Sequence, residues 1–254
     1  MGILNVTPDS FSDGGRFDDV GRAVERALAM AAAGADIIDI GGESTRPGFK
    51  PVGVDDELAR VIPVIGALRA RSDVAISVDT MKPAVARAAV AAGASLWNDV
   101  SALSHAPDSL ETAAELGCPV ILMHSQPGAG AQTMVDDVVA YLHQRMEVAI
   151  AAGVAIDNIW LDPGIGFAKG GPSQSFALVR HLDRIVALGR PVLLGASRKR
   201  FISAADPAAV DPCDRLAGSI ALALAGARAG AAGLRVHDVR ETRQALLVAA
   251  AVHG

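Results

Sequence analysis

Residues 2–15 read GILNVTPDSFSDGG, and this stretch has the arrangement that recurs along the whole chain. A short apolar run ends at Asn5, and a polar loop with one aromatic side chain, Phe11, follows it. A turn needs only Gly, Pro or Ser, whereas this loop also has an asparagine at the end of a strand and a phenylalanine among polar residues. Such a composition favours a loop that handles a ligand.

Short runs of β-branched residues and leucine predict eight strands, at Gly2–Val6, Asp36–Ile40, Val74–Val78, Ser95–Asn98, Val120–Met123, Ile159–Leu161, Val192–Leu194 and Leu234–Val236. Alanine-rich segments with helical spacing predict eight helices, at Val20–Ala33, Asp55–Ala70, Pro83–Ala92, Asp108–Leu116, Val135–Ala152, Ser173–Leu188, Asp214–Ala229 and Val239–Ala251. Strands that alternate with helices predict an α/β fold with a parallel sheet. At 254 residues we expect a single (β/α)8 TIM barrel, one domain over residues 1–254, with a doubly wound open sheet as the alternative.

The composition narrows the class of protein. A net charge of −5 argues against a broad basic surface for nucleic acid. Cys118 and Cys213 lie far apart and lack the spacing of a metal site, so we expect two reduced thiols. The start of the chain does not read as a signal peptide, and no apolar stretch reads as a transmembrane helix. We therefore expect a cytoplasmic protein with neither nucleic acid nor membrane as a partner.

The two ends of the predicted strands differ in chemistry. The turns that lead from helix to strand are small and contain glycine, as in Ala33-Gly34-Ala35 and Ala92-Gly93-Ala94. The segments that follow the strands carry polar side chains, among them Asn5, Asp39, Glu43, Asp79, Asn98, His124, Asp162, Ser197, Lys199, Arg235 and His237. Because TIM barrels build their active sites at the carboxyl ends of the strands, this asymmetry predicts an enzyme without naming its reaction.

Asp79, Asn98 and Asp162 are the strongest candidates for binding a ligand. Each carboxylate also has an ordinary interpretation, since Asp79 lies near a helix start and Asp162 begins a Pro-Gly turn. Together at one rim, the three side chains can read a planar heterocycle that bears both hydrogen-bond donors and acceptors.

A cluster of cations near the end of the chain predicts an anion site. The run Ser197-Arg198-Lys199-Arg200 directly follows an apolar strand, where barrels often bind anions, although solvated charge runs are common. Arg235 and His237 are two residues apart at a strand end and project to the same side. Residues 41–48, GGESTRPG, form a second polar loop that resembles a mobile lid more than a plain turn.

Eight motifs in this order resemble the dihydropteroate synthase family: NVTPDSFSDGG, GGESTRPG, SVDT, NDVS, LMH, DPGIGF, GASRK and RVHDV. The resemblance spans nearly the whole chain and implies a (β/α)8 barrel, usually a homodimer. It also implies a transferase of folate biosynthesis that joins 4-aminobenzoate to 6-hydroxymethyl-7,8-dihydropterin diphosphate with Mg2+, by SN1-like substitution. Sulfonamides are the expected competitive inhibitors.

The resemblance also assigns residues. The pterin pocket falls on Asp79, Asn98, Met123, Asp162 and Lys199, with Arg235 stacked on the pterin face. The diphosphate falls on Asn5, Arg235 and His237, with Mg2+ near Asn5. The aminobenzoate side and the two loops that close over the site fall on Phe11, Asp13, Thr45, Arg46, Pro47, Phe167 and Lys199.

The chain departs from the family pattern at two places. Arg200 stands where many members have serine, so a hydroxyl contact to the aminobenzoate carboxylate is replaced by Arg200 or by a backbone N–H. The stretch Ser125-Gln126-Pro127-Gly128 is less like the usual loop. Two other functions stay open: a pterin-binding methyltransferase and a non-catalytic relative that binds a pterin or a protein.

Overall fold

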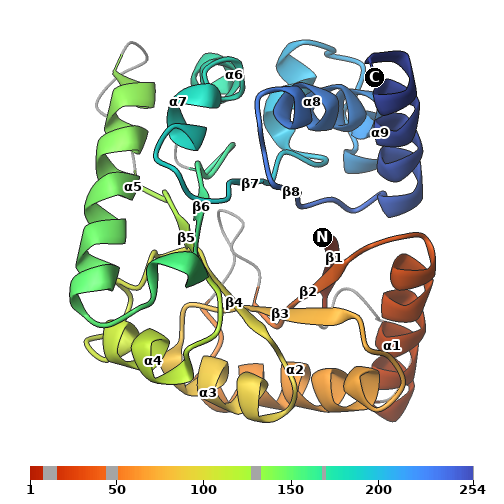
Figure 1. The fold of residues 1–254 in the computed structure, drawn as a ribbon. Coiled ribbons are helices and arrows are strands. Elements are labelled where there is room, and N and C mark those ends of the chain that lie inside the picture. The colour runs from red at the N-terminus through yellow and green to blue at the C-terminus, as the bar shows by residue number, and fades with distance from the viewer. Residues whose placement is uncertain (8–15, 44–50, 127–132, 168–169, 254) are drawn as a thin grey trace.

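The computed structural model describes residues 1–7, 16–43, 51–126, 133–167 and 170–253. In these residues, parallel strands lie at the centre and helices surround them (Figure 1). The strands are β1 (Gly2–Asn5), β2 (Ile37–Gly41), β3 (Ala75–Asp79), β4 (Leu96–Asp99), β5 (Val120–Met123), β6 (Ile159–Asp162), β7 (Leu193–Leu194) and β8 (Gly233–Leu234).

The strands close into a barrel through two narrow contacts. β1 to β6 pair in sequence order as one sheet, and β7 pairs with β8 as a second. A single bridge between Leu161 and Val192 joins β6 to the β7 segment, and another between Gly2 and Val236 joins the end of the barrel to β1. The backbone N–H of Leu161 donates to Pro191 at 2.9 Å beside the first bridge. The predicted (β/α)8 barrel is confirmed, and the open sheet is wrong.

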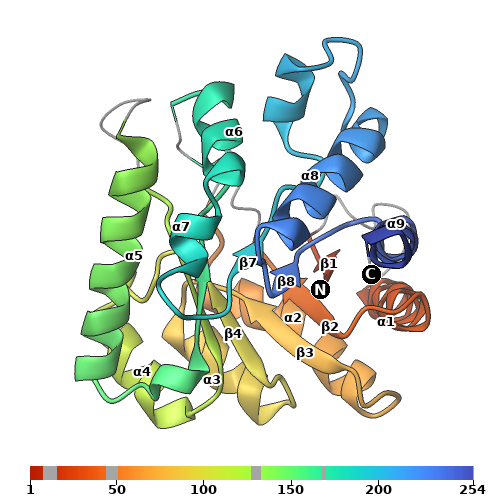
Figure 2. The ribbon, with the colours of Figure 1, turned by 45° about the horizontal axis from the view of Figure 1, so that its top comes forward.

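The helices follow the strands around the outside. They are α1 (Arg16–Ala32), α2 (Val54–Arg69), α3 (Pro83–Ala91), α4 (Ser109–Leu116), α5 (Met134–Ala151), α6 (Pro172–Arg180), α7 (Asp183–Val186), α8 (Leu216–Arg228) and α9 (Val239–His253). Short 3-10 turns are η2 (Ile156–Asn158), η3 (Arg200–Ala204) and η4 (Pro212–Arg215). In both views α9 lies beside α1, which completes the ring of helices (Figure 2).

Three predicted elements differ from the structure. The single helix expected at Ser173–Leu188 is wrong, because the backbone leaves helical geometry at His181 and splits it into α6 and α7. α6 packs on both α5 and α8, and α7 packs on α5. The helix expected at Asp214–Ala229 begins as the 3-10 turn η4, and the strand expected at Leu234–Val236 is β8, Gly233–Leu234. There the chain leaves β7 after Arg235 and pairs with β1 at Val236.

Apolar side chains fill two separate spaces. The larger core lies between the strands and the helices, and valine, leucine, isoleucine and alanine dominate it, as the low aromatic content predicts. A smaller cluster of Leu96, Ile121 and Leu193, with Ile37 and Trp160 against it, comes from the alternate positions of the strands and fills the barrel interior. Polar residues begin above this cluster, toward the carboxyl ends of the strands.

Among the described residues, no helix is both long and apolar enough to cross a membrane. Cys118 and Cys213 are both free thiols, as predicted.

Candidate active site

Asn5, Gly41, Asp79 and Asn98 lie in register at the carboxyl ends of the first four strands. Asn5 pairs with Gly41, Gly41 with Asp79, and Asp79 with Asn98. A Cβ on Gly41 would lie 3.3 Å from the Cβ of Asp79, so glycine leaves room beside that carboxylate. The structure thus brings three of the predicted site residues to one rim.

The guanidinium of Arg235 joins this rim from the opposite side of the barrel closure. Its Nε donates to Oδ2 of Asp39 at 2.6 Å, and its Nη2 donates to Oδ2 of Asp79 at 2.7 Å. Asn98 donates from Nδ2 to the same Oδ2 of Asp39 at 3.2 Å. Asp39 therefore holds the side chains of both Arg235 and Asn98, and neither needs a ligand to be held in position.

Asp39 was named among the polar residues at the strand ends, but no contact to a ligand or to another site residue was predicted for it. It is fully buried in the middle of β2, one layer below the rim, and Ser77 is its partner in register on β3. Within the described part of the chain, Oδ1 of Asp39 and Oγ of Ser77 have no hydrogen-bond partner. The signal that could have found Asp39 is a carboxylate inside an otherwise apolar strand, Ile37-Ile38-Asp39-Ile40.

Asp39 and Asp79 share one guanidinium, and the protonation of Asp79 depends on burial and on these two charged neighbours. Burial raises the pKa of Asp79 to about 7, the guanidinium of Arg235 opposes that rise, and repulsion from Asp39 adds to it. Burial alone would lower the pKa of Arg235, but the attraction of Asp39 and Asp79 outweighs it and the pKa is raised. Arg235 therefore stays charged, while Asp79 can gain or lose a proton near neutral pH.

Asp162 and Lys199 meet Arg235 around Gly195. An added Cβ on Gly195 would lie 3.7 Å from Oδ2 of Asp162, and 3.9 Å from both Cβ of Arg235 and Nζ of Lys199. Oδ1 of Asp162 accepts a hydrogen bond from the backbone N–H of Gly164 at 2.6 Å. Any side chain in place of Gly195 would fill the space that these three groups share.

Lys199 lies along the turn that follows β6. Its Nζ donates to the carbonyl of Ile165 and sits 4.2 Å from the centre of the Phe167 ring. Gly166 has a φ of +80°, and a Cβ there would lie 2.9 Å from Cδ of Lys199. Phe167 and Lys199, both predicted for the aminobenzoate side, are therefore in contact.

The predicted anion cluster divides into two pairs. Oγ of Ser197 lies 3.0 Å from Nδ1 of His237 and accepts from its backbone N–H at 3.2 Å. Arg198, whose φ is +56°, forms an ion pair with Asp238, with Nε donating to Oδ2 at 2.9 Å. The guanidinium of Arg198 thus has a structural role in its ion pair with Asp238, whereas His237 lies at the rim, two residues after Arg235.

The remaining predicted residues fall into two groups. Met123 is buried at the end of β5, paired with Asp162. His124, a weaker candidate, is buried edge-on against Tyr141, with ring centres 4.8 Å apart. The loop residues lie outside the described residues: Phe11, Asp13, Thr45, Arg46 and Pro47.

A divalent ion would have few protein ligands at this rim. In the described part of the chain, no group of three or more His, Cys, Asp or Glu side chains could hold a metal. Asn5, half-buried at the end of β1, offers one amide oxygen. This fits Mg2+, which commonly keeps several waters and takes oxygens from a substrate phosphate.

The fold and the rim together define a class, namely a TIM-barrel protein with a cluster of charged and amide side chains at the carboxyl ends of its strands, where such barrels build their active sites. The chain matches the pterin binding enzyme family over residues 1–237. It is 45% identical over 248 residues to the dihydropteroate synthase of Streptococcus pyogenes serotype M3 (strain ATCC BAA-595 / MGAS315), covering 98% of this chain and 93% of that protein. It is 46% identical over 241 residues to that of Bacillus subtilis (strain 168), covering 95% and 84%.

The solved structures agree with these relatives. The dihydropteroate synthase of Xanthomonas albilineans with 4-aminobenzoic acid has a TM-score of 0.95 and 49% identity, over 100% of this chain and 92% of that chain. The chain therefore belongs to the dihydropteroate synthase family of pterin-binding enzymes, and it is a transferase.

Proposed function

We propose that this protein condenses 6-hydroxymethyl-7,8-dihydropterin diphosphate with 4-aminobenzoate, giving 7,8-dihydropteroate and diphosphate in the cytoplasm. The observation that carries the proposal is the convergence of Asp79, Asn98, Asp162, Lys199 and Arg235 at one end of the barrel. Among the relatives, the Xanthomonas albilineans enzyme has been solved both with 4-aminobenzoic acid and with 7,8-dihydropteroate.

The pterin would lie against the acidic side of the pocket. Carboxylates accept hydrogen bonds from ring N–H and exocyclic amino groups, and Asp162 and Asp79 offer two such acceptors. Asn98 offers an amide that both donates and accepts. The planar guanidinium of Arg235, held by Asp39 and Asp79, can stack on the ring face.

The charge pattern favours a dissociative, SN1-like reaction. The C–O bond between the methylene carbon and diphosphate breaks first, and the diphosphate leaves with the electron pair. The cation left on the pterin is delocalised over its ring and faces the carboxylates of Asp79 and Asp162. The amine of 4-aminobenzoate then forms the C–N bond and releases a proton. No covalent bond to the protein is required, so no nucleophile is assigned.

The leaving diphosphate would meet the cationic side of the rim. Arg235, His237 and Asn5 come from the first and last strands, which the Gly2–Val236 bridge holds together. Preorganised cations and donors stabilise the charge that develops on a leaving group. Mg2+, held at Asn5 and by the diphosphate itself, would supply Lewis-acid stabilisation of the same charge.

The amine would approach from the side of Phe167 and Lys199. Their contact places a cation next to an aromatic ring, which suits a benzoate whose carboxylate and ring both need a partner. A sulfonamide complex is known for the Yersinia pestis enzyme, which is 43% identical with a TM-score of 0.91 over 99% of this chain and 93% of that chain. We propose that sulfonamides compete with 4-aminobenzoate here as well, and that the protein is a homodimer, which sedimentation velocity can test.

The deciding experiment measures product formation. The purified protein is mixed with pterin diphosphate and Mg2+, with and without 4-aminobenzoate, and 7,8-dihydropteroate and diphosphate are quantified. Formation of both products only in the complete mixture supports the synthase. Tight pterin binding without turnover would support a non-catalytic binder, and omission of Mg2+ should lower the rate of diphosphate release.

A further inference from the structure

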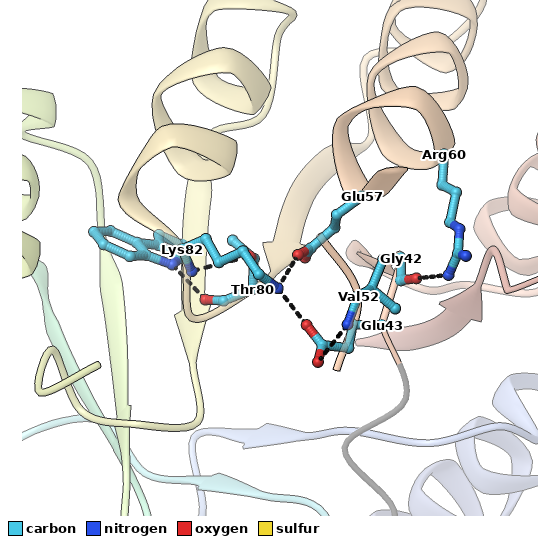
Figure 3. A network of polar contacts seen from close by, with 8 residues as sticks. Gly42, Glu43, Val52, Glu57, Arg60, Thr80 and Lys82 are labelled. Carbon is cyan, nitrogen blue, oxygen red and sulfur yellow. Dashed lines mark hydrogen bonds and ion pairs between the residues drawn. The ribbon is translucent and has the colours of Figure 1, made fainter. Parts of the chain in front are cut away.

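A second polar network lies beside the pocket, at the carboxyl ends of β2 and β3 (Figure 3). Its centre is Lys82, whose Nζ contacts the carboxylates of both Glu43 and Glu57. The distance from Nζ to Oε2 of Glu57 is 2.5 Å. The side chains of Lys82 and Glu43 are each only 12% exposed, and that of Glu57 is fully buried, so this is an almost dry ion-pair cluster. None of its members is among the residues assigned to substrates above.

Glu43 holds two separated parts of the chain together. It is the last described residue after β2, and its Oε1 accepts from the backbone N–H of Val52 at 3.3 Å. Residues 44–50 connect these two positions. They include Thr45, Arg46 and Pro47, which the family resemblance assigns to the aminobenzoate side and the loops of the site. The Glu43 side chain therefore fixes the separation of the two ends of that connection.

The network is anchored on α2. Gly42 packs so closely there that a Cβ would lie 2.9 Å from Val61 and 3.1 Å from Glu57. Arg60 donates from Nη1 to the carbonyl of Gly42 at 2.8 Å. Glu57, also on α2, accepts a hydrogen bond from Lys82. The same helix therefore contacts both Gly42 and Lys82.

Lys82 also belongs to the segment that carries Asp79. Its backbone N–H donates to Oγ1 of Thr80 at 3.1 Å, and the carbonyl of Thr80 accepts from the buried indole N–H of Trp97 at 2.8 Å. The strand end that presents Asp79 to Arg235 is thus only three residues from the ammonium that holds Glu43. A displacement of Lys82 would change the position of Glu43 relative to Asp79.

We propose that Lys82 is a positioning residue: through Glu43 and Glu57 it sets where the β2 strand end and Val52 lie relative to the pterin pocket, and thereby sets the affinity for the second substrate. The inference rests on the proposed function for its effect on 4-aminobenzoate. Burial alone would lower the pKa of Lys82, but the hydrogen bonds that its ammonium donates to Glu43 and Glu57 outweigh that effect and the pKa is raised, so the ammonium stays charged.

The test compares four variants by steady-state kinetics. Lys82→Met removes the ammonium, and Lys82→Arg keeps the charge. The double variant Lys82→Met/Glu57→Gln removes the cation together with the fully buried carboxylate, so that it can fold even where the single variant fails. Arg71→Met is the matched control, because Arg71 pairs with Glu25 at an exposed site where both side chains are at least half exposed.

We expect Lys82→Met and the double variant to raise the KM for 4-aminobenzoate about tenfold, because a mutation far from the chemistry can misplace the groups that position a substrate. The KM for pterin diphosphate should change less than the KM for 4-aminobenzoate, because Asp79 keeps its contact with Arg235 and Asp162 keeps the backbone N–H of Gly164. Lys82→Arg should restore most of the aminobenzoate KM, and Arg71→Met should match the wild type.

A readout independent of activity is amide exchange at Val52, whose N–H should exchange faster in the Met variants than in the wild type. A folded double variant with wild-type KM values and unchanged Val52 exchange would overturn the proposal. A parallel change of both KM values that follows the loss of Tm would also overturn it, since it indicates a merely structural role. If the wild-type protein makes no product, the proposed function fails, and Val52 exchange still tests the network.

Discussion

At the scale of single residues, the pocket depends on carboxylates that do two tasks. Asp79 holds Arg235 and is also placed to accept from a pterin, whereas Asp162 accepts from the Gly164 N–H and faces the pocket near Lys199. A hydrogen bond to a charged group contributes about 1.5–3 kcal/mol, and a cation–π contact contributes about 0.5–2 kcal/mol. Asp162 should therefore contribute more to pterin affinity than the stacking of Arg235.

Asp162→Asn should weaken pterin binding by about 1.5–3 kcal/mol, which is roughly 10- to 150-fold in Kd. Isothermal titration calorimetry with a pterin ligand measures this directly. Asp157→Asn is the control, because that carboxylate is exposed and pairs with Arg190 at the surface. An unchanged Kd in the Asp162 variant would contradict the assignment.

Arg235→Ala should reduce both pterin affinity and turnover, since the guanidinium faces the pterin and the leaving diphosphate. It also leaves Asp39 and Asp79 without their shared cation, and breaking a buried pair costs about 3–5 kcal/mol of stability. Chemical denaturation checks the stability, and kcat and Kd check the two functional effects. Loss of affinity alone, with kcat unchanged, would contradict a role at the diphosphate.

Pterin affinity should depend on pH through Asp79. With its pKa raised to about 7 by burial, the carboxylate form grows as pH rises from 6 to 8, so the Kd should fall over that range. Calorimetry from pH 5.5 to 8.5 should give a midpoint near 7, and the dependence should vanish in Asp79→Asn. A flat profile in the wild type would count against Asp79 as an acceptor.

The same shift has the opposite sign for stability. Because the pKa of Asp79 is higher in the folded than in the unfolded chain, its contribution is fully present below about 3.8 and is lost as pH rises through about 7. The free energy of unfolding of the wild type, relative to Asp79→Asn, should therefore decrease from pH 5 to pH 8 in urea denaturation. An increase over that range would contradict the raised pKa.

At the scale of elements, two helical glycines differ in whether a side chain would fit: Gly226 is buried in α8, and Gly21 is exposed in α1. In α8 a Cβ on Gly226 would lie 2.3 Å from Cδ2 of Leu194 in β7, whereas Gly21 in α1 has nothing within 4 Å of that position. Both residues are helical, so replacing either one with alanine gives a similar gain in helix propensity. The difference between them reflects their positions, because Gly226 is buried against the barrel and Gly21 is exposed to solvent.

Gly21→Ala should stabilise the protein by about 0.5–1 kcal/mol, because alanine is the better helix former. Gly226→Ala should instead destabilise it, since overpacking costs about 1–3 kcal/mol and exceeds the helix-propensity gain. Thermal unfolding checks both: Tm should rise by about 2–4 °C per kcal/mol for the first and fall for the second. Equal shifts in both variants would show that α8 can move outward freely.

At the scale of the whole molecule, the barrel is uneven around its circumference. β2 and β3 share five paired positions, whereas β7 and β8 share two, and the barrel closes on each side of that pair through one bridge. Stretches with few backbone pairs open at lower free energy than the rest of a fold. The β7–β8 side is also the side that carries Lys199, Arg235 and His237.

Native-state hydrogen exchange should show lower protection on the β7–β8 side of the barrel. The amides of Leu161 and Arg235, which donate hydrogen bonds on that side, should exchange about tenfold faster than those of β3, a difference of about 1.4 kcal/mol in opening free energy. Two-dimensional NMR in D2O resolves the individual amides, and the β3 amides serve as the internal control. Equal protection on both sides would mean that the barrel opens as one unit.

Much of this architecture was predictable from local pattern. Runs such as Val120–Met123 predict strands, and Asp79 and Asp162 stand out because each follows such a run. The role of Asp39 was missed because its partners Arg235 and Asn98 lie far away in the sequence, so only the closed barrel brings them together. Lys82 was missed because Met81-Lys82-Pro83 looks like an ordinary helix start. The break at His181 was missed because the helical spacing of apolar residues continues through it, although the backbone there is not helical.

The shared carboxylate of Asp39 has a consequence for how the protein could evade an inhibitor. A compound that mimics the pterin would rest on Arg235 and Asn98, and both are tied to Asp39 inside the barrel. A substitution that removes either contact also leaves a buried charge or amide without its partner. A mutation that weakens inhibitor binding in this way would therefore also destabilise the protein. Residues of the pterin pocket should therefore tolerate far fewer escape mutations than surface positions do, and a deep mutational scan under such an inhibitor would reveal that asymmetry.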